Sequence, residues 1–311
     1  MLSIFVTLRR SAVVPVALCL GCLLCSRASA APSNNVYATF GTVFSGTAGY
    51  LYGFGTFDLA NPTGSPGSYS YAWTTLTSPA SPVLSNVAMD PGTGSMVLSY
   101  EFTQFRSISA TGILSGSLGP TPTLWGMAYD TAGDLYGYDS IGTPWLKLDP
   151  ANGQTLAQGV LVGDVTGNDI YSSFGGNLAA RPAGGFFMAN QANAVPELVR
   201  FGLVGDDAAT VLTGTFAGTG FDPQQVIEMT LFASGSSLFL LSGSSIYSVD
   251  ESNAALTQLG VIAGLPANFQ NFTGAASTVT AVPEPATFGL LACGGAAWCA
   301  VRARRIGRRR R

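Results

Sequence analysis

The side chains that most often carry catalysis are scarce in this chain of 311 residues. It contains no histidine, which excludes Ser-His-Asp and Cys-His catalysis as well as metal sites built on imidazole. All five cysteines lie near the two ends, so the segment 31–282 has neither a thiol nucleophile nor a thiolate ligand. Catalysis there would depend on carboxylate pairs, on Lys147 or on a few Ser and Tyr hydroxyls. We therefore expect no catalytic residues, no cofactor and no enzymatic activity.

Paired carboxylates are the remaining route to catalysis, because two of them are enough to hydrolyse a glycosidic bond. Most acidic residues of this chain stand beside Gly, Pro or Asn, where an Asp side chain hydrogen-bonds its own backbone in a turn. Four of them fall in corresponding turn positions of a repeat, which favours a structural role: Asp90, Asp130, Asp149 and Asp250. The candidates for a catalytic pair are Asp130, Asp134, Asp139, Asp149, Glu197, Asp222 and Glu228.

Two further groups of residues have the right type for binding. Asp164 and Asp169 flank a short Gly- and Asn-containing segment and offer a weak possibility of a calcium site. This segment lacks the alternating ligand spacing and the distal Glu of a calcium-binding loop. The tryptophans are able to stack on sugar rings, but at strand positions such residues more often belong to a hydrophobic core: Trp73, Trp125 and Trp145.

The charge of the chain is divided between its middle and its ends. All acidic residues except Glu284 lie in 31–282, 16 of the 17. Only four of the 14 basic residues lie there, so this segment is near −12 although the whole chain is at −3. The four are Arg106, Lys147, Arg181 and Arg200. Such a segment repels nucleic acid and anionic lipid, so we expect no nucleic-acid partner.

The elements that would position these residues are predicted to be β-strands. Short alternating or aromatic runs bounded by Gly, Pro, Asn and Asp dominate the middle of the chain, which is typical of an all-β protein. Similar hairpins begin at Val87, Met127, Leu178 and Met229, about 40 to 51 residues apart. Third strands follow from Trp145, Leu198 and Ile246, and fourth strands are expected in 154–162, 210–216 and 256–262. A four-stranded unit of this length is the period of a β-propeller blade.

The two ends of this repeat region are predicted to pair with each other. The segment from Phe272 has the pattern of a first strand, and the segment from Asn35 has that of a second strand. Their pairing would complete one blade and remove two exposed sheet edges. We expect about five units, although 41–85 is irregular and leaves room for another. The turns resemble those of WD40 or YVTN-like propellers in layout, without either signature. A β-sandwich or a solenoid remains the alternative.

The first thirty residues are predicted to form a secretory signal peptide. Arg9 and Arg10 precede an apolar run too short to span a membrane comfortably, and a cleavage site of small residues follows. Ala28 and Ala30 define this site, so the mature protein would begin at Ala31. A lipoprotein signal at Cys22 is the alternative, although Cys19 occupies the position where an aliphatic residue is expected.

The last thirty residues combine three features in a fixed order. The motif Pro283-Glu284-Pro285 is followed by an uncharged run from Ala286 to Val301, which we expect to be a transmembrane helix. An arginine cluster ends the chain and would stay on the cytoplasmic side: Arg302, Arg304, Arg305, Arg308, Arg309, Arg310 and Arg311. A buried core helix followed by a basic nucleic-acid-binding arm is the alternative, but the run lacks the polar face of a core helix.

This arrangement resembles the PEP-CTERM sorting signal of Gram-negative bacteria that produce exopolysaccharide. The resemblance covers only about the last thirty residues. It implies that an exosortase, a membrane-embedded transpeptidase-like enzyme, recognises Pro283, Glu284 and Pro285 and cuts near them. The protein would pass through the inner membrane and then reach the cell surface or the extracellular matrix.

The sequence thus predicts three parts: a signal peptide (1–30), an all-β extracytoplasmic domain (31–280) and a sorting signal (281–311). The expected partners are the secretion machinery with its signal peptidase, an exosortase, and exopolysaccharide. The expected role is structural or binding, in the exopolysaccharide layer. The alternative is a secreted glycosidase or lyase that depends on carboxylates.

Overall fold

The computed structural model describes the middle of the chain in eleven ranges. These are 34–43, 50–63, 67–76, 86–100, 104–122, 124–139, 145–165, 178–191, 195–204, 207–223 and 229–278. By its contacts the chain divides into two units, Met1–Pro32 and Ser33–Arg311, and every described residue belongs to the second. The predicted signal peptide with Ala28, Ala30 and Ala31 lies outside these ranges. The sorting motif Pro283-Glu284-Pro285, the predicted transmembrane helix and the arginine cluster also lie outside them.

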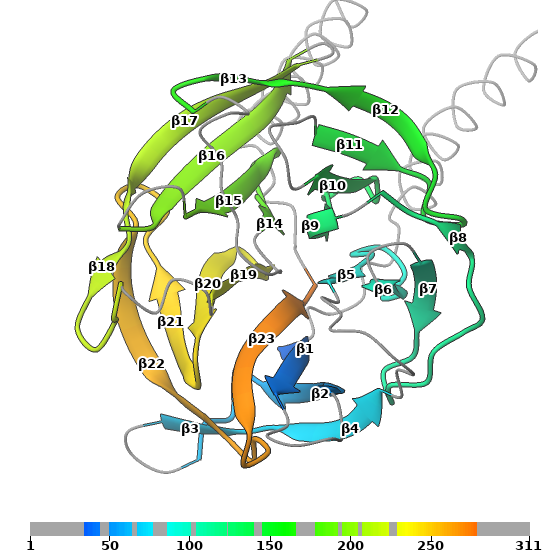
Figure 1. Ribbon diagram of the computed structural model, residues 1–311. Helices are drawn as coiled ribbons and strands as arrows, with labels where there is room; N and C mark the ends of the chain where they lie inside the picture. Colours follow the sequence, from blue (N-terminus) through cyan, green and yellow to red (C-terminus); the bar gives the residue numbers. More distant parts are fainter. Residues whose placement is uncertain are drawn as a thin grey trace, which may run out of the picture. The chain divides into compact units, whose positions relative to one another are not determined.

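The described residues form five sheets of mainly antiparallel strands, which are the blades of a β-propeller (Figure 1). Blade 1 has the order β23(Phe269–Ala276), β1(Asn35–Val43), β2(Tyr50–Asp58), β4(Ala72–Leu76) from the centre outward. Blade 2 contains β5(Asn86–Met89), β6(Met96–Tyr100), β7(Gln104–Ile108) and β8(Gly119–Pro120). Blade 3 contains β9(Leu124–Tyr129), β10(Leu135–Asp139), β11(Trp145–Leu148) and β12(Thr155–Gly159).

Blades 4 and 5 carry additional strands at their outer edges. Blade 4 contains β14(Leu178–Ala180), β15(Phe186–Asn190), β16(Glu197–Val204) and β17(Asp207–Thr215), and β13(Leu161–Gly163) pairs in parallel with β17. Blade 5 contains β19(Met229–Ser234), β20(Ser237–Ser242), β21(Ser245–Val249) and β22(Ala255–Ala263). Two short strands, β18(Ala217–Gly218) and β3(Gly67–Ser70), pair in parallel with β22. These strands cover edges that would otherwise expose unpaired backbone groups.

The predicted all-β propeller architecture and the four predicted hairpins are confirmed, and the β-sandwich alternative is wrong. Two details of the prediction need correction. The expected fourth strand at 154–162 ends at Gly159, because the next residues form β13 and pair with the following blade. The irregular segment 41–85 holds no further blade within its described residues. It supplies the outer strands of blade 1 and the edge strand β3 of blade 5.

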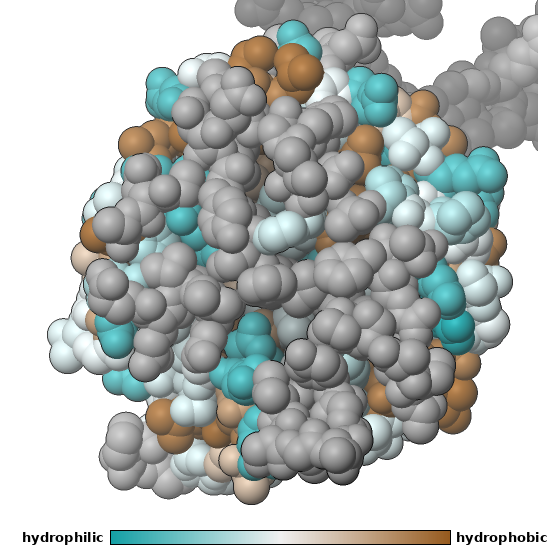
Figure 2. Space-filling model, in the orientation of Figure 1, coloured by the Kyte–Doolittle hydropathy of each residue, from teal (hydrophilic) through white to brown (hydrophobic). Residues whose placement is uncertain are grey.

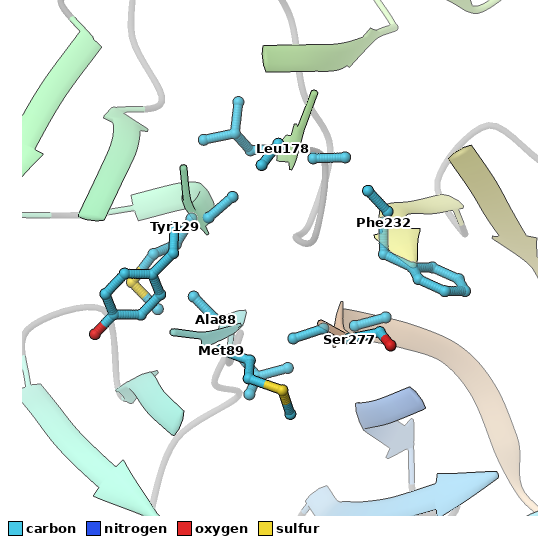
Figure 3. Close-up of a pocket in the computed structure, with 14 residues that line it drawn as sticks. Ala88, Met89, Tyr129, Leu178, Phe232 and Ser277 are labelled. Carbon is cyan, nitrogen blue, oxygen red and sulfur yellow. The ribbon is translucent and has the colours of Figure 1, made fainter. Parts of the chain in front are cut away.

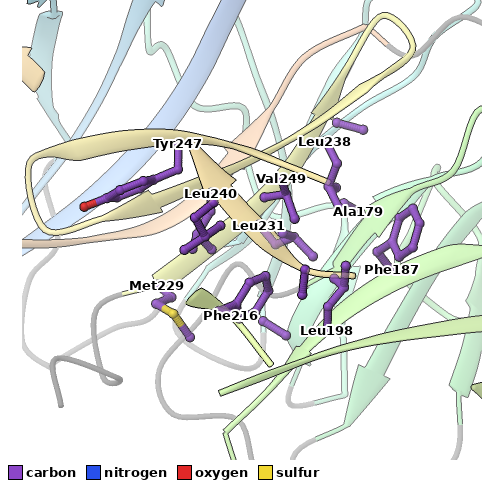
Figure 4. Packing of buried hydrophobic residues seen from close by; sticks show 14 residues of the cluster. Ala179, Phe187, Leu198, Phe216, Met229, Leu231, Leu238, Leu240, Tyr247 and Val249 are labelled. Carbon is purple, nitrogen blue, oxygen red and sulfur yellow. The ribbon is translucent and has the colours of Figure 1, made fainter. Parts of the chain in front are cut away.

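The hydrophobic core consists of five clusters of buried side chains, one between each pair of neighbouring blades. Figure 4 shows the cluster between blades 4 and 5, in which Phe187 and Leu198 of blade 4 lie together with Leu231 and Leu240 of blade 5. The cluster between blades 5 and 1 joins Leu241 to Phe40 and Phe272 in the same way. Five interfaces between five blades require a closed ring, so burial of apolar surface holds each blade to both neighbours.

The ring is closed by the two ends of the described chain, as the sequence predicted. β1 pairs with β23 in antiparallel register, and Ala38 stands opposite Ala275. A chain of hydroxyl contacts supports this pairing: the Thr273 hydroxyl lies 3.0 Å from that of Thr39, and Ser277 Oγ donates to the Asn35 carbonyl at 2.9 Å. Innermost and second strands of blade 1 therefore come from opposite ends of the domain, and this blade cannot form until both ends are in place.

The described ranges contain no helix that is long and apolar enough to cross a membrane.

Candidate functional site

The innermost strands of the five blades surround a narrow channel (Figure 3). Each strand contributes at least one alanine to its lining, which allows the strands to approach the centre closely: Ala88, Ala128, Ala179, Ala233 and Ala276. The larger side chains of these strands, Met89, Met127, Leu178 and Phe232, belong to the clusters between blades, and in Figure 3 the ring of Phe232 points away from the centre. The free volume is about 20 Å³, enough for about one water molecule and too small for a sugar ring.

The described residues that line this channel include no carboxylate. Within the described ranges, Tyr129 and Ser277 are the only lining residues with a polar side-chain group, and in Figure 3 the phenol of Tyr129 points away from the centre. Tyr129 is buried, and burial together with the negative charge of Asp90 raises the pKa of its phenol well above the usual range. A phenol held neutral in this way is not a base for proton abstraction. Among the described residues, the channel therefore has neither the space nor the groups for carboxylate catalysis.

The acidic residues of the repeat turns hydrogen-bond their own backbone, as predicted. In each case a carboxylate oxygen accepts a hydrogen bond from the backbone N–H two residues later, at 2.8 to 2.9 Å. The residues are Asp90, Asp130, Asp149 and Asp250. Asp58 does the same in blade 1. Asp90 and Asp130 follow the first strand of a blade, whereas Asp149 and Asp250 follow the third, so two turns of the blade share one solution.

The turn at Asp250 is expected to make the stability of the protein depend on pH. The hydroxyl of Ser252, followed by its backbone N–H, donates to Asp250 and lowers the pKa of this carboxyl below its ordinary value. The charged form is thus favoured in the folded state. The stabilisation is complete above the unfolded pKa and is lost as the pH falls through the folded one. We expect Asp250→Asn to make the melting temperature fall less steeply between about pH 5 and 2. Thermal unfolding at several pH values measures this, and parallel curves for both proteins would contradict it.

The other candidate acids are not brought together in the described ranges. Asp134 accepts a hydrogen bond from the Lys147 ammonium at 2.7 Å. This hydrogen bond is the largest influence on the pKa of Lys147 and raises it, whereas burial has a smaller effect in the opposite direction. Lys147 is therefore a charged, paired surface group and is not an activated nucleophile. Glu197 accepts a hydrogen bond from the Asn190 amide at 3.2 Å, and Asp222 is exposed. The Asp139 side chain and Glu228 lie outside the described residues.

The predicted calcium segment is described only in part. Asp164 accepts a hydrogen bond from the backbone N–H of Leu212 at 3.1 Å, which fixes the connection between β13 and blade 4. Asp169 lies outside the described ranges. In the part of the chain that the structure describes, no three acidic residues gather as they would around a metal ion.

The tryptophans belong to the core, as expected for aromatic residues on strands. Trp145 is buried between blades 3 and 4, and Trp125 packs against the same cluster. Trp73 packs against the cluster between blades 5 and 1, and its indole N–H donates to the Gly264 carbonyl at 2.9 Å. Trp145 is buried, whereas Trp73 and Trp125 are half-buried against their clusters.

A second hollow, which sequence reasoning missed, lies between blade 1 and blade 2. It is a groove of about 500 Å³. Tyr37 of β1 forms one side, Met96 and Ile108 lie in its buried floor, and the connection after β7 forms the rim with Ile113 and Ser115. One sequence signal was available: in this blade Ser109 stands after the third strand, where blades 3 and 5 have Asp149 and Asp250. The serine at this repeat position indicates that the turn in blade 2 differs from those in blades 3 and 5.

No protein-family model matches the chain, and no curated protein matches it by sequence. Loose likenesses exist among solved structures. Virginiamycin B lyase from Staphylococcus aureus is 13% identical, with a TM-score of 0.37, over 71% of this chain and 69% of that one. A functionally unknown protein from Desulfotomaculum acetoxidans is 14% identical, with a TM-score of 0.40, over 78% and 72%. A protein of unknown function from Bacteroides caccae is 11% identical, with a TM-score of 0.40, over 80% and 99%. Likenesses at this level carry no function to this chain, and the propeller assignment rests on the strand pairing itself.

Proposed function

We propose that this chain is an exported protein of the cell surface or extracellular matrix that has a structural or binding role in the exopolysaccharide layer and is not an enzyme. The observation that supports it is the alanine-lined channel, whose free volume of about 20 Å³ between the described strands is too small for a sugar ring. The other support is chemical, because the segment 31–282 has no histidine and no cysteine. A stable ring without reactive groups suits a protein that holds a polymer or a neighbour.

The proposed route to this place begins and ends with the two terminal segments. A signal peptidase would cut between Ala30 and Ala31, and an exosortase would cut near Pro283-Glu284-Pro285. β1 begins at Asn35 and β23 ends at Ala276. Both proposed cleavage sites therefore lie outside the described strands of the ring, so neither cut removes one of these strands. This proposal rests on the resemblance of the tail to a PEP-CTERM signal.

A carboxylate-dependent glycosidase or lyase is the competing function. Such an enzyme needs two carboxyl groups facing one substrate, about 5 to 10 Å apart. The described candidates instead cap turns, as Asp130 and Asp149 do, or pair with Lys147, as Asp134 does. This use of the acids supports binding over catalysis.

The route is tested by intact-mass analysis of the protein exported from cells with and without the exosortase. With the enzyme, we expect a product that begins at Ala31 and has lost every residue after the Pro-Glu-Pro motif, including the arginine cluster. Without the enzyme, we expect the same N-terminus and a retained tail. A product that keeps its arginines in the presence of the exosortase would contradict the sorting proposal. Recovery of the uncut chain from the cytoplasm would contradict export itself.

A further inference from the structure

The connection between the third and fourth strands of blade 2 is longer than that in blades 3, 4 and 5, and only blade 1 has a longer one, of thirteen residues, which includes β3. It runs over 109–118, ten residues, whereas the same connection takes six residues in blade 3 and five in blade 5. In repeat proteins, insertions into single units often lie on the binding face. This one forms the rim of the groove between blades 1 and 2.

The inserted segment is held in one conformation by its own hydrogen bonds. Ser109 N–H donates to the Ile113 carbonyl at 3.0 Å, and Ile113 N–H donates back to the Ser109 hydroxyl at 3.0 Å. Beyond this turn, Leu114 bridges to Ile108, and Ser115 N–H donates to the Ser107 carbonyl at 2.9 Å. A rim fixed in advance loses little conformational entropy when it binds a ligand.

The rim carries an apolar side chain that the fold itself does not use. Ile113 is 71% exposed, the highest value among the exposed large hydrophobic residues of the described ranges. Its backbone closes the turn, but its side chain stands over the groove in place of the polar residue that a solvent-facing turn favours. Contact with a bound molecule would remove this surface from water.

The described lining of the groove carries no charged side chain. Ser109 contributes to this, because it replaces the aspartate that caps the same turn in blades 3 and 5. The lining mixes apolar side chains with hydroxyls of Ser95, Ser107, Ser109 and Ser115. Apolar surface interrupted by hydroxyl groups matches a neutral sugar, whose ring faces are apolar and whose edges hydrogen-bond.

We propose that the groove between blades 1 and 2 binds an uncharged saccharide, with Ile113 and Tyr37 against the sugar rings. This inference rests on the proposed role in the exopolysaccharide layer and names the ligand class of that role. The net charge near −12 of the segment 31–282 disfavours an anionic polymer, and the described lining of the groove offers no carboxylate to a cationic one. The volume of about 500 Å³ lies within the usual range of small-molecule sites, about 300 to 1,000 Å³.

The test uses the exported protein and calorimetric titration with hexasaccharides of glucose, galactose and mannose. A hexamer of galacturonic acid is the anionic comparison. We expect at least one neutral hexamer to bind and the anionic one not to bind. Ile113→Gln should weaken that binding roughly 5-fold, because it removes one apolar contact. The matched control is Leu156→Gln, since Leu156 is 60% exposed on β12 outside the groove. The control should bind as the unmodified protein does. Both variants should keep the melting temperature because neither side chain is buried.

Two results would overturn the saccharide site. One is that no neutral hexamer binds the unmodified protein, and the other is that Ile113→Gln binds as tightly as the control. If either occurs while the processed protein is still found in the matrix, the groove assignment fails and the proposed function stands. If the protein is absent from the matrix altogether, the proposed function fails, whatever the sugars do.

Discussion

A variant with Ala38→Cys and Ala275→Cys is expected to form a disulfide spontaneously. Its free energy of unfolding should be about 3–5 kcal/mol higher than that of the reduced form. The two residues stand opposite each other on β1 and β23 and share one buried cluster, so their side chains point to the same side of the sheet. Directly opposed residues of antiparallel strands have Cα atoms about 4.5 to 5.5 Å apart, which suits a disulfide. The crosslink would close a loop of more than 230 residues. The expected stabilisation is large because a long loop is restrained in the unfolded chain.

The segment 31–282 contains no cysteine of its own, so this measurement has little background. Loss of free thiol reports formation of the bond, and urea unfolding before and after reduction gives its effect. The two single variants are the controls and should match each other. Thiols that stay free under mild oxidation would show that β1 and β23 are not neighbours and that the ring is not closed by them.

Truncation of the central aromatic residue of the closing blade should have an effect of similar size and opposite sign. Phe40 is fully buried, and its ring lies 5.2 to 5.9 Å from those of Tyr71, Trp73 and Phe269. It also fills the space over Gly53, where any added Cβ would lie 2.1 Å from the ring. We expect Phe40→Ala to lower the free energy of unfolding by about 3–5 kcal/mol, because it removes buried apolar surface and leaves a cavity.

Urea unfolding at equilibrium measures this loss. Leu156→Ala is the comparison, because that side chain lies on the exposed outer strand of blade 3 and its removal should cost less than about 0.5 kcal/mol. Figure 2 shows such exposed apolar residues as separate hydrophobic patches near the rim of the described part. A loss below about 1 kcal/mol for Phe40→Ala would mean that blade 1 does not depend on its aromatic core.

The strands and their order were largely predictable because each blade repeats a visible pattern. Hairpins beginning at Val87, Met127, Leu178 and Met229 alternate in side-chain type and turn at Gly or Asp, and both properties are local. The closure by Asn35 and Phe272 was predictable for a different reason, because each segment lacked the partner that the other supplies.

The edge strands and the groove were not predictable from local patterns. β3, β13 and β18 are two to four residues long and pair in parallel with a distant strand, so they are too short to show a periodic sequence pattern. The groove joins Tyr37 of one blade to Ile113 of the next, and its lining exists only after the blades have packed. The channel was not predictable either, because its lining brings together alanines from five strands that are far apart in the sequence. The terminal segments carry the clearest sequence motifs and lie outside the described ranges.

The role of this protein as a binding ring without catalysis is tested most directly in one assay that follows both properties. The exported protein is incubated with a neutral polysaccharide, and the mixture is separated by size while protein and polymer are detected together. We expect the protein to elute with the polymer and the polymer to keep its chain length over a prolonged incubation. Shortened chains or new unsaturated ends, produced in proportion to the protein added, would show a hydrolase or a lyase and contradict the role proposed for it.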